Sequence, residues 1–425
     1  MKEIKLKGLD ISVYTEKLRN GLEIYFIPYA NKKNYFVSYA TRYGSIVTRF
    51  IPIGSKEEIK VPDGIAHFLE HKMFEQEDGV DPFSYFSESG TGSNASTSFD
   101  NTQYICYGTK NFEDNLRYLL KFVNSPYFTD ENVEKEKGII SEELKMYEDI
   151  PEFKLEMKLR ENVYHNDSRR VDIGGTIPEI MKITKDDLYN CYNNFYVPSN
   201  MFLLVVGNFD REKALEIVKE EVGSKDNRVL PTIKKVREKK SVRLKEDEFE
   251  ASIKTPKLGI GVKIPIKDLG VGDDLTLDLY LTMISTLCFG SASLFRERVR
   301  NKKLLSSFYT EWETTDDYKV FYIMAASDDI DELLENIIEE FNNLEIMEDA
   351  FNRMKKVWIA NEVKMIDYID STVRNVFDDI LHYGKVIPDK LDRIRKMDFN
   401  TIKKIADKID FTNTSVIKMV STDKN

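Results

Sequence analysis

The sequence predicts an α+β protein of two related domains, each a mostly antiparallel sheet with helices packed on one face. A repeated order of elements supports this fold class: a strand and two helices at 104–107, 111–123 and 132–147 recur at 321–324, 330–344 and 348–366. Within the repeat, Glu143-Leu144-Lys145-Met146 aligns with Glu362-Val363-Lys364-Met365. A repeat of roughly two hundred residues is too long for a solenoid and suits two similar domains.

The chain is long enough for two cores, with 425 residues of which 41% are hydrophobic. We predict an N-terminal domain at 1–222, a charged linker at 223–252 and a C-terminal domain at 253–425. A basic run in the linker can bind anions, but its alternation with acidic residues favours a solvated hinge. Strand character resumes at 258–264, and Pro265 is expected to end that strand.

A helix predicted to begin after Pro62-Asp63-Gly64 carries the most informative residues of the chain. One of its faces is an apolar stripe suited to a core, formed by Ile65, Leu69 and Met73. The opposite face carries His67, Glu70 and His71, which make an H-x-x-E-H motif. Residues four apart lie one above the other on a helix, so both imidazoles can bind one metal ion.

The order H-x-x-E-H is a zinc-peptidase motif, the inverse of the commoner H-E-x-x-H. The chain has only four histidines, which makes a chance match improbable. The alternative is a helix with two solvated surface imidazoles. In the metal interpretation, Zn²⁺ is the cofactor, and a water occupies the position that the protein ligands leave open.

A catalytic zinc ion usually has three protein ligands, so we expect a third from another element. The predicted helix at 132–147 offers Glu136 and Glu143, which are two helical turns apart and can face the same side. From the residues alone, either Glu142 or Glu143 could be the ligand, and a solvated acidic face is the alternative for any one of them.

These residues together resemble the insulysin, pitrilysin and mitochondrial-processing-peptidase family of zinc endopeptidases, most of all its short bacterial branch. The resemblance covers residues 15–210 and extends more loosely beyond them. Besides the metal motif it rests on Asn20-Gly21-Leu22, Gly92 to Thr97, Glu134 to Met146, Ile183-Thr184, Asp187-Leu188, Phe195-Tyr196, Asn200-Met201 and Val205 to Asn208. It implies that Glu143 is the third zinc ligand, that Glu70 is the general base, and that Glu136 has a supporting catalytic place near the metal.

The resemblance also implies where substrate binds. Asn94 and Ala95 correspond to a strand that pairs with an extended peptide; from sequence alone, Asn94 could instead be a turn residue. The family's second half usually supplies an Arg and a Tyr that grip substrate. Arg300 and Tyr309 are the possible counterparts here, but their spacing differs from the family pattern and its glycine is missing. Paired family members divide these parts between subunits, so we expect a homologous partner, in a heterodimer or a homodimer.

The expected function is therefore hydrolysis of short or unfolded peptides by a zinc-dependent endopeptidase, with Glu70 as general base. The second half lacks the histidine pair and has Lys355 where Glu136 would fall, so only the first half can bind zinc. Two other classes remain open: a non-catalytic scaffold subunit, and a peptide-binding maturation factor with a vestigial metal site.

Composition adds expectations about partners and compartment. The net charge of −11 gives no electrostatic footprint for nucleic acid. No run approaches eighteen apolar residues, and the first residues lack the apolar core of a signal peptide, so we expect no membrane partner. Three widely separated cysteines, Cys106, Cys191 and Cys288, are expected to be reduced and buried, as in the cytoplasm.

Overall fold

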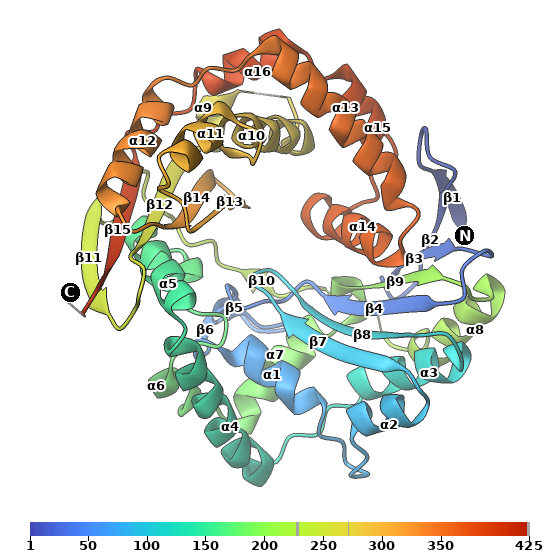
Figure 1. Ribbon diagram of the computed structural model, residues 1–425. Helices are drawn as coiled ribbons and strands as arrows, with labels where there is room; N and C mark the ends of the chain where they lie inside the picture. The colour runs from blue at the N-terminus through green and yellow to red at the C-terminus, as the bar shows by residue number, and fades with distance from the viewer. Residues whose placement is uncertain (227–228, 271, 423–425) are drawn as a thin grey trace. The chain divides into compact units, whose positions relative to one another are not determined.

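A computed structural model describes residues 1–226, 229–270 and 272–422. The chain forms two compact units that interleave along the sequence. The first contains Met1–Lys145, Asp172–Lys235 and Val363–Asp389, and the second contains Met146–Val171, Val236–Glu362 and Lys390–Asn425. Each unit therefore combines segments from both sides of the predicted 223–252 linker. Each is a sheet covered by helices, which confirms the predicted α+β class (Figure 1).

The first unit is built on a seven-stranded sheet in the order β1-β2-β3-β9-β4-β8-β7. Its strands are β1 (Lys2–Lys5), β2 (Ser12–Lys17), β3 (Glu23–Pro28), β9 (Met201–Gly207), β4 (Tyr35–Thr41), β8 (Thr102–Gly108) and β7 (Gly92–Thr97). All neighbours are antiparallel except β3 and β9. A small sheet joins β5 (Arg49–Ile51), β6 (Ile59–Lys60) and β10 (Thr232–Ile233). Strand β7 lies at the edge of the large sheet, where one side of its backbone is free to pair.

Most helices of the first unit pack on one face of this sheet and form the first core. They are α1 (Ile65–Met73), α2 (Pro82–Glu88), α3 (Phe112–Val123), α4 (Asp130–Glu148), α6 (Ile177–Ile180), α7 (Lys185–Phe195) and α8 (Arg211–Val222). The opposite face is covered by α14 (Ile369–Tyr383), in orange-red in Figure 1. Met201 and Leu203 of β9 point into the first core, whereas Phe202 and Leu204 point toward α14. Because both faces are covered, β9 is buried along its whole length and reads as a continuous apolar run.

The second unit has a five-stranded sheet in the order β11-β15-β12-β14-β13. Its strands are β11 (Glu246–Ala251), β15 (Thr414–Ser421), β12 (Lys257–Pro265), β14 (Tyr318–Ala326) and β13 (Ser307–Thr314), and only β11 and β15 are parallel. Its helices are α9 (Ile266–Leu269), α10 (Asp274–Phe289), α11 (Leu294–Asn301), α12 (Ile330–Asn342), α13 (Glu348–Met365), α15 (Lys390–Lys396) and α16 (Phe399–Ala406). Strand β12 ends at Pro265, as predicted.

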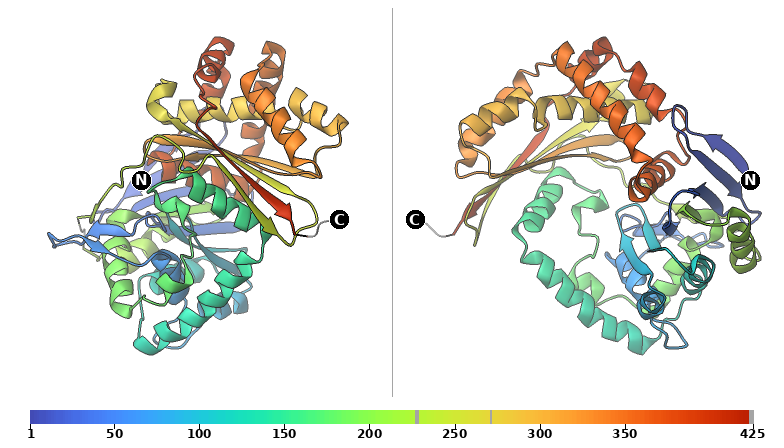
Figure 2. Two further views of the ribbon diagram at one scale, coloured as in Figure 1. Left: turned by 90° about the vertical axis from the view of Figure 1, so that its left-hand side faces the viewer. Right: turned by 45° about the vertical axis from the view of Figure 1, so that its right-hand side comes forward.

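Helix α5 (Pro151–Val163), in green in Figure 2, packs on the other face of this second sheet although it follows α4 in sequence. Two glycines of β12 make room for it. A Cβ at Gly261 would lie 2.5 Å from Cγ2 of Val163, and one at Gly259 would lie 3.3 Å from Cδ2 of Leu159. The absence of side chains at these positions lets the helix approach the strand closely.

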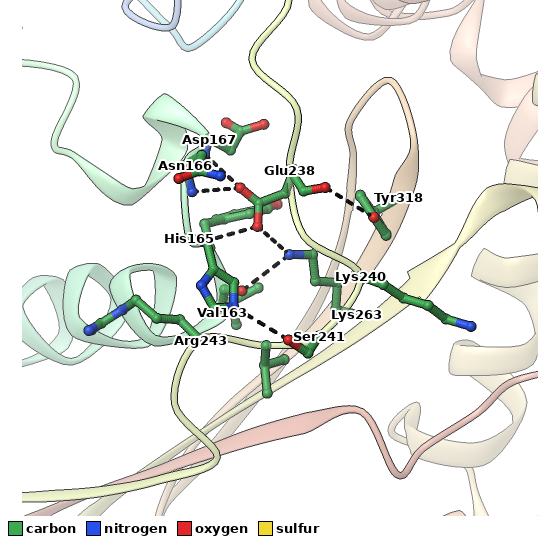
Figure 3. Close-up of polar contacts among 12 residues, drawn as sticks. Val163, His165, Asn166, Asp167, Glu238, Lys240, Ser241, Arg243, Lys263 and Tyr318 are labelled. Carbon is green, nitrogen blue, oxygen red and sulfur yellow. Dashed lines mark hydrogen bonds and ion pairs between the residues drawn. The ribbon is translucent and has the colours of Figure 1, made fainter.

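From Val236 onward the predicted linker belongs to the second unit, whereas β10 within it pairs with β5 in the first unit. The carboxylate of Glu238 accepts hydrogen bonds from the backbone N–H groups of His165, Asn166 and Asp167 at 2.9, 2.7 and 2.8 Å (Figure 3). It also lies 2.7 Å from Nζ of Lys263, whose side chain is fully buried. Strand β11 falls within the same predicted linker. The exposed residues that alternate along this edge strand are charged. For this reason the sequence pattern predicted a solvated linker where the structure has a strand.

Within the part of the chain that the structure describes, one stretch, Asp274–Asn301, which contains α10 and α11, is long and apolar enough to cross a membrane by length and composition alone. Half of its most apolar window is buried within the protein. Leu277, Leu281 and Ile284 of α10 belong to the main core of the second unit, so packing accounts for the apolar content. The three cysteines are free and buried, as predicted.

Candidate metal centre

Helix α1 carries three of the predicted site residues, and its N-cap residue is Gly64, a position that leaves no room for a side chain. Gly64 has φ +86°, and a Cβ there would lie 2.3 Å from the carbonyl oxygen of Gly174. The expected apolar stripe of α1 is buried in the first core, and its members are Ile65, Leu69 and Met73. The opposite side presents His67 and His71, whose ring centroids are 4.6 Å apart.

Helix α4 brings Glu143 to both histidines. Nε2 of His67 lies 3.9 Å from Oε1 of Glu143, and Nε2 of His71 lies 3.5 Å from its Oε2. Adjacent Glu142 points away: its side chain is 76% exposed and pairs with Lys145 at 2.7 Å. Of the two candidate acids, the structure therefore places Glu143 in the site.

One ligand atom from each of His67, His71 and Glu143 can be chosen so that all lie within 4.8 Å of one another. Ligands about 2.1 Å from a tetrahedral zinc ion are about 3.4 Å apart, and the separation of 3.5 Å between Glu143 and His71 is close to this value. Burial, together with the charge of His71, lowers the pKa of His67 to about 4, so this imidazole is neutral at neutral pH. A histidine must be deprotonated to the neutral imidazole to bind a metal ion, and the donor set of two neutral imidazoles and one carboxylate fits zinc.

Glu136, two turns before Glu143 on α4, supports His71 from behind. Its Oε1 lies 3.0 Å from Nδ1 of His71, and because a carboxylate only accepts, the imidazole N–H donates. Burial opposes ionisation of Glu136, but the hydrogen bond from His71 and the charges of His71 and Lys72 together outweigh it and lower the pKa of Glu136. Burial likewise opposes protonation of His71, yet this bond and the nearby carboxylates raise the pKa of His71.

Glu70 lies on the same face of α1 and is only 9% exposed. Thr97 at the end of β7 donates a hydrogen bond to its Oε2 at 2.7 Å. Burial raises the pKa of Glu70, although the Thr97 hydroxyl and His71 counteract this effect. A carboxylate with a raised pKa is a better proton acceptor, which suits a general base.

The predicted substrate residues Asn94 and Ala95 lie on the edge strand β7. Asn94 is exposed, and its Oδ1 accepts a hydrogen bond from the backbone N–H of Ala95 at 2.9 Å. Ala95 is partly buried and packs against the first core. Because Ala95 and Thr97 alternate with Asn94, they share the face directed at α1, and Asn94 points to the other face.

Arg300 and Tyr309 belong to the second unit and are held by different neighbours. Arg300 donates to the carbonyl oxygen of Ser291 at 3.3 Å. Tyr309 is 59% exposed on β13, and its hydroxyl lies 3.4 Å from Glu311. The structure does not bring the two side chains together as a pair. Lys355, aligned with Glu136 in the repeat, donates to the carbonyl oxygen of Met397 at 2.7 Å, so it serves packing in the second unit.

Sequence reasoning missed two residues of the site, Thr97 and Lys72. Thr97 could have been found from the alternation of β7, which places it on the same face as Ala95. Lys72 follows the second histidine directly and is fully buried. Its burial was not predictable, since a lysine beside a polar motif is ordinarily solvated.

Two family models match the chain. Residues 38–176 match the model described as insulinase (peptidase family M16), and residues 182–357 match that described as peptidase M16 inactive domain. The chain belongs to the M16 peptidase family.

Known proteins of this family resemble the chain along most of its length. The uncharacterized zinc protease YmfH of Bacillus subtilis is 40% identical over 344 residues, which are 79% of each chain. The crystal structure of an M16-like peptidase from Alicyclobacillus acidocaldarius is 29% identical, with a TM-score of 0.90 over 98% of this chain and all of that one. The periplasmic protease PqqL from Escherichia coli shares the fold at 18% identity, with a TM-score of 0.76 over 96% of this chain and 47% of PqqL.

Proposed function

We propose that the chain is a zinc-dependent endopeptidase that hydrolyses short or unfolded peptides. The observation that carries the proposal is the convergence of His67, His71 and Glu143 from two helices, with Glu70 beside them. These three residues would hold Zn²⁺, and the names of zinc-protease relatives such as YmfH support that metal. When bound, zinc supplies Lewis-acid activation of a water and of the peptide carbonyl.

Glu70 is the proposed general base. Its buried carboxylate accepts a proton from the attacking water and returns it to the leaving amine. The hydrogen bond from Thr97 fixes one carboxylate oxygen, which leaves the other to handle the proton. Glu136 keeps the Nδ1 proton of His71 in place, so that Nε2 of this ring stays available as a ligand.

The open edge of β7 is the proposed binding site for the peptide backbone. An added strand gains main-chain hydrogen bonds there without demanding a particular side-chain sequence. Asn94 lies exposed on this strand, three residues before Thr97, which contacts the proposed base. A bound strand would therefore run past Glu70, and only an extended, unfolded segment can pair in this way.

We also propose that the active enzyme contains a second, homologous subunit, in a heterodimer or a homodimer. This chain corresponds to about half of PqqL, as expected if two such chains match one longer peptidase. Its Arg300 and Tyr309 do not form a pair, and its second half matches the inactive-domain model, so substrate contacts from another chain would complete the site. The buried free cysteines support a reducing compartment such as the cytoplasm.

Metal analysis combined with a cleavage assay separates this proposal from the alternatives. The purified protein, with its native partner where one copurifies, should contain about one zinc per chain. It should cleave a mixed pool of unstructured peptides, and a chelator should stop the cleavage. A scaffold subunit would cleave nothing and hold no zinc, whereas a maturation factor with a vestigial site would hold zinc and bind peptides without cleaving them.

A further inference from the structure

Lys72 is a buried cation in an unusual position, on the core side of the metal-binding helix. Its side chain has no exposed surface. The residues of α1 buried around it are mostly apolar, and they include Phe68, Leu69 and Met73. Lysine is almost never fully buried unless its ammonium group is paired, because removal of an unpaired charge from water is costly. The groups that pair with the Lys72 ammonium group should therefore account for its burial.

Two carboxylates contact the Lys72 ammonium group. Nζ lies 3.7 Å from Oε2 of Glu136, which comes from α4. It also forms a close ion pair with Glu75, three residues further along the chain and 40% exposed. Glu136 thus divides its carboxylate between two neighbours: one oxygen accepts from His71, and the other faces Lys72. The two contacts together restrain the orientation of the Glu136 carboxylate.

The carboxylates of the site also favour a cation beside Glu136. Three carboxylates, those of Glu70, Glu136 and Glu143, lie near the two histidines. A divalent cation alone would leave one negative charge without a counterpart. The Lys72 ammonium group, which also pairs with the partly exposed Glu75, adds a positive charge beside Glu136 and so reduces the cost of burying that carboxylate.

His67 provides a contrast within the same site. Its Nδ1 is buried and has no hydrogen-bond partner among the residues that the structure describes. Among the described residues, His71 and not His67 has a carboxylate hydrogen-bonded to its Nδ1, so the orientation of the His71 ring depends on its contact with Glu136. Any residue that fixes Glu136 consequently acts on the metal-binding nitrogen of His71.

We infer that Lys72 is a positioning residue of the proposed zinc site, whose buried ammonium group fixes the Glu136 carboxylate and, through it, the ring of His71. The inference rests on the proposed function in assuming that the site holds zinc. It assigns Lys72 no contact with substrate or metal. Its effect is on zinc affinity and on the geometry around the ion, and loss of activity follows from these.

The test compares zinc affinity in Lys72→Met, Glu136→Gln and the double variant, measured by competition with a chelator. Lys72→Met keeps much of the side-chain length but removes the charge. We expect it to weaken zinc binding about 10- to 100-fold, as outer partners of metal ligands generally do. Lys72→Arg keeps the charge and should recover part of this loss. Lys145→Met is the matched control, because it breaks an exposed ion pair with Glu142 on α4, where Lys145 is 56% exposed.

The double variant distinguishes positioning from a purely structural role. If Lys72 acts through Glu136, zinc affinity in the double variant should equal that of Glu136→Gln alone, since the second change removes nothing further. The visible spectrum of the cobalt-substituted protein should change in Lys72→Met and stay unchanged in Lys145→Met. The double variant removes both charges together, so it also serves if Lys72→Met alone does not fold.

The outcomes separate the inference from the proposed function. Zinc affinity of Lys72→Met within about twofold of the parent's would overturn the inference, as would losses that simply add in the double variant. A parent protein that binds no zinc at all would overturn the proposed function, and the role of Lys72 with it.

Discussion

Oε2 of Glu143 lies 3.5 Å from Nε2 of His71, although 72 positions separate the two residues in the sequence. This contact joins α1 to α4 and makes one site from two helices that pack in the same core. It leads directly to a prediction about neighbouring acids. Glu143→Gln should weaken zinc binding more than about 100-fold, since it removes a ligand rather than a support.

Glu142→Gln is the matched control for that change. Its side chain is 76% exposed and its ion pair with Lys145 lies at the surface, so zinc affinity should stay within about twofold of the parent's. Competition with a chelator measures the zinc affinity of both variants. If Glu142→Gln proved the weaker binder, the third ligand would be displaced by one residue.

Gly64→Ala should destabilise the first unit strongly. Any side chain at φ +86° costs roughly 1–2 kcal/mol, and here the added Cβ would also lie 2.3 Å from the Gly174 carbonyl oxygen. Overpacking of this kind adds about 1–3 kcal/mol. Gly54→Ala is the control, with φ +79° and nothing within 4 Å of the added Cβ. Urea unfolding should show the larger loss for Gly64→Ala, and equal losses would contradict the close packing described here.

Glu238 should make the second unit sensitive to acid. Burial disfavours its ionised form, but the hydrogen bonds from Lys263 and the backbone N–H groups outweigh this and lower the pKa of Glu238. A lowered pKa in the folded state contributes stability above the unfolded value of about 4.3, and the contribution is lost as the pH falls through the folded pKa.

The free energy of unfolding, measured in urea at several pH values, checks this behaviour. Glu238→Gln should be less stable than the parent at pH 7, and the difference should shrink as the pH falls below about 4. Glu142→Gln serves again as an exposed control. A constant difference at all pH values would mean that ionisation of Glu238 is not what holds the linker.

Arg300→Ala should matter little to cleavage. Arg300 contacts the carbonyl oxygen of Ser291 and Tyr309 contacts Glu311, so the contacts of the two side chains do not join them as a pair. Misplacement of substrate by about 1 Å can cost on the order of 10²-fold, so addition of a homologous subunit with a regular Arg and Tyr should raise cleavage of an unstructured peptide. Full activity of a homodimer that Arg300→Ala or Tyr309→Phe abolishes would show that no such partner is needed.

The sequence predicted those features that follow from the period of a single helix. The spacing of His67, Glu70 and His71 and the stripe of Ile65, Leu69 and Met73 both follow from the period of one helix, and the structure has that helix. The second helix, α4, spans Asp130–Glu148 against the predicted 132–147. Choosing Glu143 over Glu142 required the resemblance, because periodicity alone allows either acid to face α1.

What the sequence did not predict depends on contacts between distant segments. Buried Lys72 pairs with Glu136 from another helix as well as with nearby Glu75, and β11 is a strand because β15 pairs with it. Helix α5 packs in the second unit because Gly259 and Gly261 leave room on a strand about a hundred residues later. Local propensity carries no information about such partners.

The most direct test of the central claim is zinc content and peptide turnover of Glu70→Gln, measured on the same preparation. Glu70 is not among the three proposed ligands, so the variant should keep about one zinc per chain. Loss of the general base should lower turnover of an unstructured peptide by about 10²- to 10⁴-fold. A Glu70→Gln protein that holds zinc and cleaves peptide at the parent rate would contradict the assignment of Glu70 and the mechanism built on it.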